Sequence, residues 1–304
     1  MHLTGLTFRP ATAADAKAIY ELVAASEADL DGVIEIDLDD IVTELARPGF
    51  DLERDTRLGH DATSGELVGW AQVFRGDRAE VTVHPRHQGR GIGTTLLDWT
   101  EARAAESGTD HVGQTVTDNN AAGQAILRAR GYAPKDTAWL LDIQLDAEPE
   151  VPALPEGYQL RTFQPRRDDH AVYQLIEDAF NEWPGRKPNT FEEWVAFTIG
   201  REPFAPALSP LIVAGDEIVG VAIVLDYEDA SEGYVHQLAV QRSHRHRGLA
   251  RVLLRHVFRD AYRSGRRSCV LATNSYTGAL TLYQRVGMGI RRAYTHFERM
   301  LPPA

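Results

Sequence analysis

The sequence predicts an α+β protein made of two consecutive copies of one domain, each with a mostly antiparallel sheet flanked by helices. The chain has 304 residues, enough for two domains of ordinary size. Hydrophobic residues make up 43% and charged residues 25%, proportions typical of a globular protein. The duplication itself is predicted by an internal repeat.

Two segments of the first half recur in the second half at nearly the same spacing. The longer pair is HPRHQGRGIGTTLLDW at residues 84–99 and QRSHRHRGLARVLLRH at residues 241–256, an offset of 157 residues. The shorter pair is AILRARGY at residues 125–132 and TLYQRVGM at residues 281–288, an offset of 156 residues. This period is far too long for a solenoid repeat, so it indicates a duplicated domain.

The boundary between the copies is expected at DAEPEVPALPEGY, residues 146–158. Its prolines and its glycine interrupt the helical and strand periodicities on either side. We therefore expect an N-terminal domain over residues 1–148 and a C-terminal domain over residues 156–304.

The sequence predicts the same elements in the same order for both copies. The first copy has a strand LTFR, a helix from about Ala13 with Thr12 as its cap, and strands within GELVGWAQVF and AEVTV. The second copy has a strand YQLRTF, a helix from about Asp168, and strands within DEIVGVAIVLDY and GYVHQLAV. A glycine loop and a long helix follow in both copies. In the second copy a strand SCVLAT, a helix through Tyr283 and a last strand complete the domain. This order favours an α+β fold.

The loop before each long helix predicts a phosphate site. A helix N-terminus offers unpaired N–H groups and a partial positive charge, and glycine lets the backbone approach an anion closely. The candidate residues are Gln88, Gly89, Arg90, Gly91, Ile92 and Gly93 in the first copy, and Arg245, His246, Arg247, Gly248, Leu249 and Ala250 in the second. Neither loop has the G-x-G-x-x-G spacing of a dinucleotide-binding loop, and neither carries a Walker lysine.

The pattern Gln/Arg-x-x-Gly-x-Gly/Ala after a strand resembles that of the GCN5-related N-acetyltransferases (GNAT). The resemblance covers nearly the whole chain, and the tandem arrangement is similar to that of mycothiol synthases and related actinobacterial tandem acetyltransferases. It implies two tandem GNAT domains, acetyl-CoA as co-substrate, no metal, and a small-molecule amine as acceptor. It also implies that the strand before each loop pairs with the pantetheine arm and supplies an N–H for the oxyanion. The strand residues concerned are Leu238, Ala239 and Val240 in the second copy, and Val81, Thr82 and Val83 in the first.

The resemblance also distinguishes the two copies. The family's helix after the fifth strand carries a tyrosine four residues before a glycine, and its phenol protonates the departing thiolate. Tyr283 stands in this position before Gly287, whereas Leu127 stands in it before Gly131. We therefore expect the C-terminal copy to be catalytic and the N-terminal copy to be degenerate. Whether the N-terminal copy still binds coenzyme A is left open. The alternative for Tyr283 is a half-buried aromatic of an amphipathic helix.

The base that takes the amine proton has two candidates. The resemblance implies a glutamate at the start of the fourth strand, where Tyr234 stands here. Glu232 and His236 lie two residues to either side and are expected on one face of the strand, because side chains alternate. His236 has an ordinary pKa of about 6.5, but it fits equally well as a histidine hydrogen-bonded within the sheet. A third alternative is that the amine arrives neutral and needs no protein base.

Composition excludes several partners. The formal net charge is -12, with -14 in residues 1–150 and +2 in residues 151–304, which argues against nucleic acid and anionic membranes. No signal peptide or membrane-spanning run is evident, so a cytoplasmic location is expected. Cys269 is the only cysteine and is expected in the core. His244, His246 and His256 lack partners at ligand spacing, so no metal is expected. No sequence feature specifies an oligomeric state.

The acceptor is the least determined part. The aromatic segment 177–197 could line the acceptor pocket through Trp183, Phe191 and Trp194, or it could pack in the core. A mycothiol-type reaction implies a cysteinyl amino-sugar conjugate of inositol, while an antibiotic, a polyamine or a peptide N-terminus are alternatives. The rival to an enzyme is a non-catalytic module that binds acyl-CoA as a sensor or scaffold.

Overall fold

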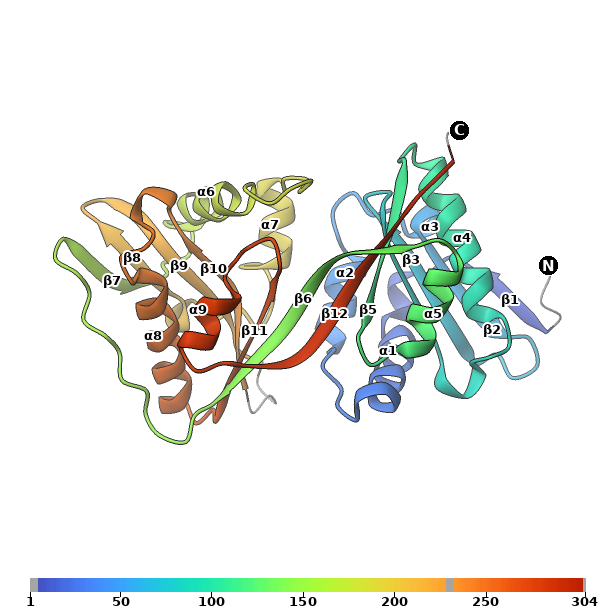
Figure 1. Ribbon diagram of the computed structural model, residues 1–304, viewed down its shortest axis with the longest axis horizontal. Coiled ribbons are helices and arrows are strands. Elements are labelled where there is room, and N and C mark those ends of the chain that lie inside the picture. The colour runs from blue at the N-terminus through green and yellow to red at the C-terminus, as the bar shows by residue number, and fades with distance from the viewer. Residues whose placement is uncertain (1–4, 228–231, 303–304) are drawn as a thin grey trace. The chain divides into compact units, whose positions relative to one another are not determined.

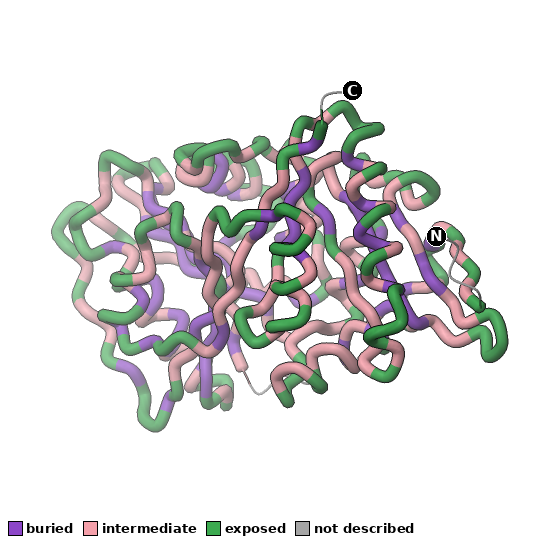
Figure 2. The backbone as a smooth tube through the Cα atoms, turned by 45° about the vertical axis from the view of Figure 1, so that its right-hand side comes forward, coloured by how far each residue is buried: buried purple, intermediate pink, exposed green. Residues whose placement is uncertain are grey.

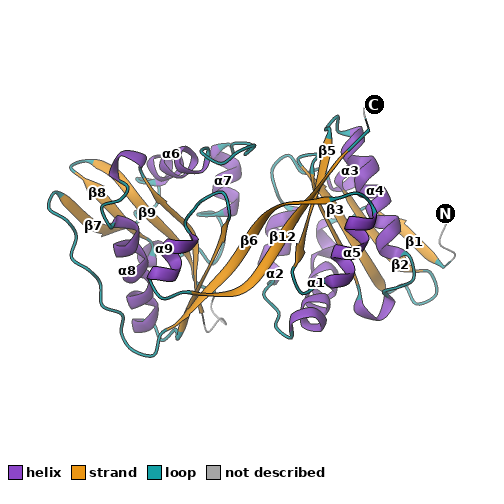
Figure 3. Ribbon diagram, in the orientation of Figure 1, coloured by secondary structure: helices purple, strands orange, loops and turns teal. Residues whose placement is uncertain are grey.

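The computed structural model describes residues 5–227 and 232–302. The chain forms two compact units, the first made of residues up to Thr137 together with those from Tyr294 onward, the second of Ala138–Ala293. Each unit is a mostly antiparallel sheet with helices packed on both faces (Figure 1, Figure 3), which confirms the predicted α+β class. Among the described helices, none is both long and apolar enough to cross a membrane.

The described part of the N-terminal unit contains five strands of its own. They are β1 (Leu6–Arg9), β2 (Thr56–Asp61), β3 (Leu67–Phe74), β4 (Arg78–Val83) and β5 (His111–Thr117). Neighbours pair antiparallel from β1 to β4, and β4 pairs with β5 in parallel. The helices are α1 (Ala16–Asp31), α2 (Leu38–Leu45), α3 (Leu52–Asp55), α4 (Ile92–Glu106) and α5 (Ala121–Ala129). On β3, Trp70 packs among the residues of α1 and α2, while Ala71 packs against α4, as alternation along a strand requires.

The C-terminal unit repeats this order. Its strands are β7 (Tyr158–Thr162), β8 (Pro210–Ala214), β9 (Glu217–Leu225), β10 (Glu232–Val240) and β11 (Ser268–Asn274), and its helices are α6 (Asp169–Phe180), α7 (Phe191–Phe197), α8 (Leu249–Arg263) and α9 (Leu280–Arg285). Among these described strands, only β10 and β11 pair in parallel. Buried residues concentrate along the strands (Figure 2). On β9, Ala222 and Val224 pack toward α8, whereas Val221 and Ile223 pack toward α6 and α7.

The last strand of each sheet comes from the other copy. β6 (Ala133–Gln144) begins in the N-terminal unit, and its residues Ala138–Gln144 pair antiparallel with β11. β12 (Gly289–Met300) begins in the C-terminal unit, and its residues Tyr294–Met300 pair antiparallel with β5. The compact units therefore differ from the contiguous ranges 1–148 and 156–304. Without these pairings β5 and β11 would each present an open sheet edge.

Candidate active site

A cavity of about 1250 Å³ opens in the C-terminal unit where β10 and β11 diverge. The two strands pair only from Glu232 with Ser268 to Val235 with Leu271, and beyond these residues they part. The cavity is lined by both strands past this point, by the start of α8 and by α9. The divergence leaves one backbone edge of β10 free, and an extended ligand such as a pantetheine arm can pair with it.

A β-bulge at His236 lies at the point of divergence. Val235 pairs with Val224 and Gln237 with Ile223, so His236 is an extra residue on β10. β3 and β4 of the N-terminal unit pair without such a shift, although β4 also parts from β5 after Ala79. A bulge bends its strand and interrupts the alternation of side chains. It therefore removes the basis for expecting Glu232 and His236 on one face.

The predicted phosphate loops of the two copies share one backbone conformation. Gly248 precedes α8 with a φ of 82°, and Gly91 precedes α4 with a φ of 83°. Two residues earlier, His246 has a φ of 62° and Gly89 a φ of 73°. A Cβ placed on Gly248 would meet no atom within 4 Å, so the space over the helix N-terminus is open to an anion.

The cavity brings together most of the predicted cofactor residues of the C-terminal copy. Those lining it are Leu238, Ala239, Val240, Arg245, His246, Gly248, Leu249 and Ala250. Arg247 lies outside it and donates hydrogen bonds to the Tyr158 hydroxyl at 3.1 Å and to the Ser243 carbonyl at 3.3 Å.

Replacement of Gly248 by valine should weaken acetyl-CoA binding at least ~10-fold. The branched side chain would occupy the open space at the helix N-terminus, and it would strain a backbone held at positive φ. Titration calorimetry with acetyl-CoA measures the effect. Gly265→Val is the matched control, because Gly265 lies just past the other end of α8 with a φ of 90° and open space around it. Equal affinities of the two folded variants would place the phosphate site elsewhere.

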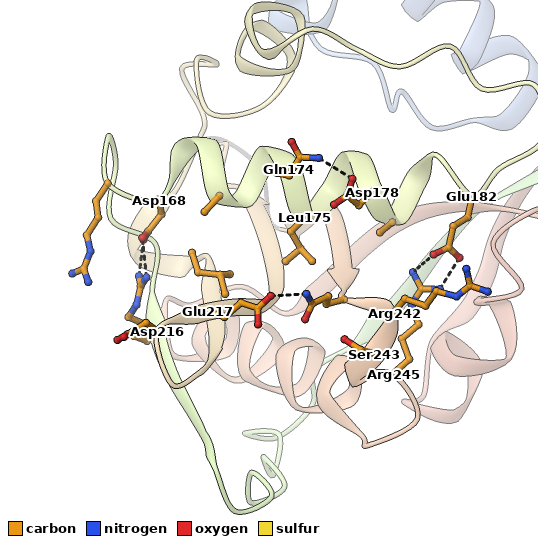
Figure 4. A pocket seen from close by; sticks show the side chains of 16 residues that line it. Asp168, Gln174, Leu175, Asp178, Glu182, Asp216, Glu217, Arg242, Ser243 and Arg245 are labelled. Atoms are coloured by element: carbon orange, nitrogen blue, oxygen red, sulfur yellow. Dashed lines mark hydrogen bonds and ion pairs between the residues drawn. The ribbon is translucent and has the colours of Figure 1, made fainter.

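Arg245 does not present a free guanidinium. Its Nη1 and Nη2 atoms donate to both carboxylate oxygens of Glu182 at 2.8 and 3.0 Å, and its Nε donates to the Val240 carbonyl at 3.0 Å. Figure 4 shows this ion pair, which also borders a second cavity of about 1050 Å³ beside α6. The pair thus lines both cavities.

Tyr283 lines the cavity from α9 and is 7% exposed. Burial raises the pKa of its phenol to about 12, partly offset by a hydrogen bond with Thr273. Thr273 also lines the cavity, and its hydroxyl lies 3.0 Å from that of Thr277. The phenol is therefore fully protonated at neutral pH, the state that a proton donor requires. The matching Leu127 is buried in an apolar cluster of the N-terminal unit.

The two candidate bases occupy different environments. His236 lines the cavity, but its Nδ1 atom is buried without a hydrogen-bond partner among the described residues. Burial and the charge of Arg201 lower the pKa of His236 to about 4. Glu232 lies outside the cavity, where Arg291 Nη1 donates to it at 2.8 Å and the Ser268 hydroxyl at 2.7 Å. These partners, with Arg291 the stronger, lower the pKa of Glu232.

Some aromatic residues of segment 177–197 line the cavity, and others pack in the core. Trp183 lines the cavity together with Phe180. Trp194 is 1% exposed and donates from Nε1 to the Gln237 side chain at 3.0 Å, and Phe191 packs beside it. Cys269 is fully buried, and burial raises its pKa to about 12, so its expected place in the core is confirmed.

The N-terminal loop carries a different set of side chains. Val81, Thr82 and Val83 end β4 half-buried, and Gln88 is exposed. Ile92 is buried and Gly93 half-buried at the start of α4, while Arg90 contacts Asp61 at 3.5 Å. Glu66, His84 and His87 each bring a potential metal-ligand atom within 4.8 Å of the others. The Nδ1 atom of His84 accepts the backbone N–H of Arg86, and the Nδ1 atom of His87 lies 2.6 Å from Arg90 Nη1, so both nitrogens already have partners within the loop.

Several cavity residues were not predicted as site residues. Arg251 directly follows the predicted loop, but it lies outside the Gln/Arg-x-x-Gly-x-Gly/Ala pattern that predicts it. Arg285 lies two residues after Tyr283, and nothing in the sequence indicates that both reach one cavity. The carboxylate of Glu182 comes from a segment 63 residues before Arg245, and such a pairing has no local signal.

A model of the acetyltransferase (GNAT) family matches residues 22–132 and 170–288. The chain belongs to this family. It is 30% identical over 285 residues to a mycothiol acetyltransferase of Nocardia farcinica, covering 90% of each chain. It is 28% identical over 229 residues to the mycothiol acetyltransferase of Streptomyces scabiei, covering 73% of each. The matches confirm the resemblance and show an acetyl-CoA-dependent acetyltransferase.

Solved structures agree with this assignment. A GCN5-related N-acetyltransferase from Sphaerobacter thermophilus superposes with a TM-score of 0.79 at 30% identity, covering 99% of this chain and 97% of the other. A tandem GNAT protein from the clavulanic acid biosynthesis pathway superposes with a TM-score of 0.74 over 98% of this chain and 99% of that one. At 19% identity the second shows the fold alone, which confirms the tandem arrangement.

Proposed function

We propose that the C-terminal unit of this GNAT protein acetylates the neutral primary amine of a small molecule, and that the N-terminal unit does not catalyse. The observation that supports this is that Tyr283 lines the same cavity as Gly248 and the N-terminus of α8, whereas the matching Leu127 of the other copy is buried in an apolar cluster. The family performs acetyl transfer. The proposal concerns which acceptor is used, which of the two units catalyses, and which residues take part.

The chemistry follows from these groups. Acetyl-CoA would lie with its diphosphate at Gly248 and its pantetheine arm along the free edge of β10. The amine nitrogen attacks the thioester carbon, and backbone N–H groups of β10 stabilise the oxyanion. The carbon–sulfur bond then breaks and the thiolate takes the Tyr283 proton. The proton released by the amine nitrogen restores the phenol, so the products are the N-acetyl amine and free coenzyme A.

The lining residues favour an acceptor without a permanent cation. Among the described residues that line the cavity, Glu182 is the only carboxylate, and both of its oxygens are bound to Arg245. A polyamine would find no free counter-ion there. An α-amine has an ordinary pKa near 8, against about 10 for an alkyl amine, so much more of it is neutral near pH 7. With the mycothiol acetyltransferase relatives, this favours an α-amine such as that of a cysteinyl amino-sugar conjugate.

A panel of amines tests the acceptor. Coenzyme A release should be fastest with cysteinyl conjugates and other α-amines, and at least ~10-fold slower in kcat/KM with spermidine. A preference for the polyamine would contradict the proposed acceptor. Tight acetyl-CoA binding without turnover of any amine would favour the sensor or scaffold alternative.

The pH profile tests whether a protein base is needed. We propose that the amine arrives neutral, because the His236 pKa of about 4 and the ion pair of Glu232 make both residues poor bases. The acid limb of kcat/KM should then follow the acceptor's own amine pKa and shift when acceptors of different pKa are compared. It should stay in place in His236→Gln and Glu232→Gln. A limb near pH 4 that vanishes in His236→Gln would instead identify His236 as the base.

A further inference from the structure

Two arginines at the cavity lack a hydrogen-bond or ion-pair partner among the residues that the structure describes. Arg251 and Arg285 both line the cavity and are exposed. Neither makes a hydrogen bond or an ion pair with any residue in the described ranges 5–227 and 232–302, whereas nearby Arg245 and Arg263 are bound to Glu182 and Glu148. Guanidinium groups that line a cavity without such a partner indicate that the counter-ion comes with the ligand.

The position of Arg251 argues against a merely solvated side chain. It is the third residue of α8, and the first turn of that helix holds no acidic residue. A cation there opposes the helix dipole at a cost of about 0.3–1 kcal/mol. The corresponding position of the N-terminal copy is Thr94, and that of Arg285 is Ala129. Both positive charges therefore occur only in the copy that also carries Tyr283.

Coenzyme A supplies two separate anionic groups. The N–H groups at Gly248 can bind the diphosphate, and Arg245 is already neutralised by Glu182. The 3′-phosphate of the ribose is a phosphomonoester with a charge of about -1.5 to -2 near neutral pH, and it needs donors of its own. Exposed guanidinium groups that line the same cavity match it in charge and in hydrogen-bonding capacity.

We propose that Arg251 and Arg285 bind the 3′-phosphate and so select coenzyme A over its 3′-dephospho form. The inference rests on the proposed use of this cavity for acetyl-CoA. The wild-type protein should bind coenzyme A about 10- to 100-fold more tightly than 3′-dephospho-coenzyme A, the range expected for one or two charge-assisted hydrogen bonds.

Calorimetry with both ligands on three variants tests this. Arg251→Gln and Arg285→Gln should each weaken coenzyme A binding and leave 3′-dephospho-coenzyme A binding unchanged, so that the preference shrinks. Arg255→Gln is the matched control, because Arg255 lies one turn further along α8, also has no partner among the described residues, and is outside the cavity. It should change neither affinity.

Three results would contradict either this inference or the proposed binding of acetyl-CoA in the cavity, and the measurements tell these cases apart. Equal wild-type affinity for both ligands would exclude a 3′-phosphate site. Equal weakening of both ligands in the arginine variants would assign these side chains to the diphosphate. If wild-type protein bound neither ligand, the proposed function of the cavity itself would fail.

Discussion

Tyr283→Phe should lower kcat by about 10²- to 10⁴-fold, the range that general acid catalysis contributes. The substitution removes one hydroxyl from a buried ring and keeps the ring's packing in the apolar cluster of the C-terminal unit. Because the thiolate forms only as the carbon–sulfur bond breaks, the loss should appear in kcat and leave the acetyl-CoA dissociation constant nearly unchanged. Steady-state kinetics and calorimetry on one preparation measure both quantities.

The matched control is Leu127→Met. Leu127 occupies the corresponding helix position in the N-terminal copy and is 2% exposed, and methionine conserves its volume. Turnover should stay at the wild-type value. A comparable loss in both variants, or acetyl transfer by Tyr283→Phe at the wild-type rate, would contradict the proposed division of labour.

The raised pKa of Tyr283 also predicts how kcat depends on pH. A phenol with a pKa of about 12 keeps its proton through the whole range in which the protein can be assayed. No basic limb from this group should therefore appear in kcat up to about pH 10. A basic limb between pH 8 and 10 that disappears in Tyr283→Phe would show that the ligand-bound site lowers the pKa of the phenol.

Phe297→Ala should destabilise the N-terminal unit by about 3–5 kcal/mol, the usual cost of deleting a buried phenyl group. Phe297 lies on β12, is fully buried, and packs with Val73, Val112 and Leu127. Its backbone pairs with Gln114 on β5. The C-terminal end of the chain therefore supplies a core residue and a sheet strand to the unit that begins at the N-terminus.

Hydrogen exchange resolved by segment measures this effect. Amides of β5 should lose protection in Phe297→Ala, and those of β9 and β10 should change much less. Met300→Ala is the matched control, because Met300 lies on the same strand but is 63% exposed, and it should shift stability by less than about 0.5 kcal/mol. A chain ending at Ala293 should show the strongest loss in β5. Unchanged β5 protection in that shortened chain would contradict the strand exchange.

The sequence alone determined the features that depend on neighbouring residues. The glycine loop and the helix that follows are set by about six adjacent residues, because φ above zero and a helix N-terminus are local properties. Gly91 and Gly248 accordingly adopt almost the same φ in the structure. The fold class followed from the repeated order of such local elements. The contrast between Tyr283 and Leu127 followed from their equal spacing of four residues before a glycine.

Only the tertiary structure decided the features that depend on distant partners. Strand pairing across a sheet is set by long-range packing, so the sequence does not reveal that β6 completes one unit and β12 the other. The bulge at His236 removed the expected alternation with Glu232. Burial then moved the pKa of His236 to about 4, whereas its type alone suggested about 6.5. Desolvation, ion pairing and the absence of a partner for Arg251 and Arg285 among the described residues all depend on the surroundings of each side chain. Only the folded chain brings those surroundings together.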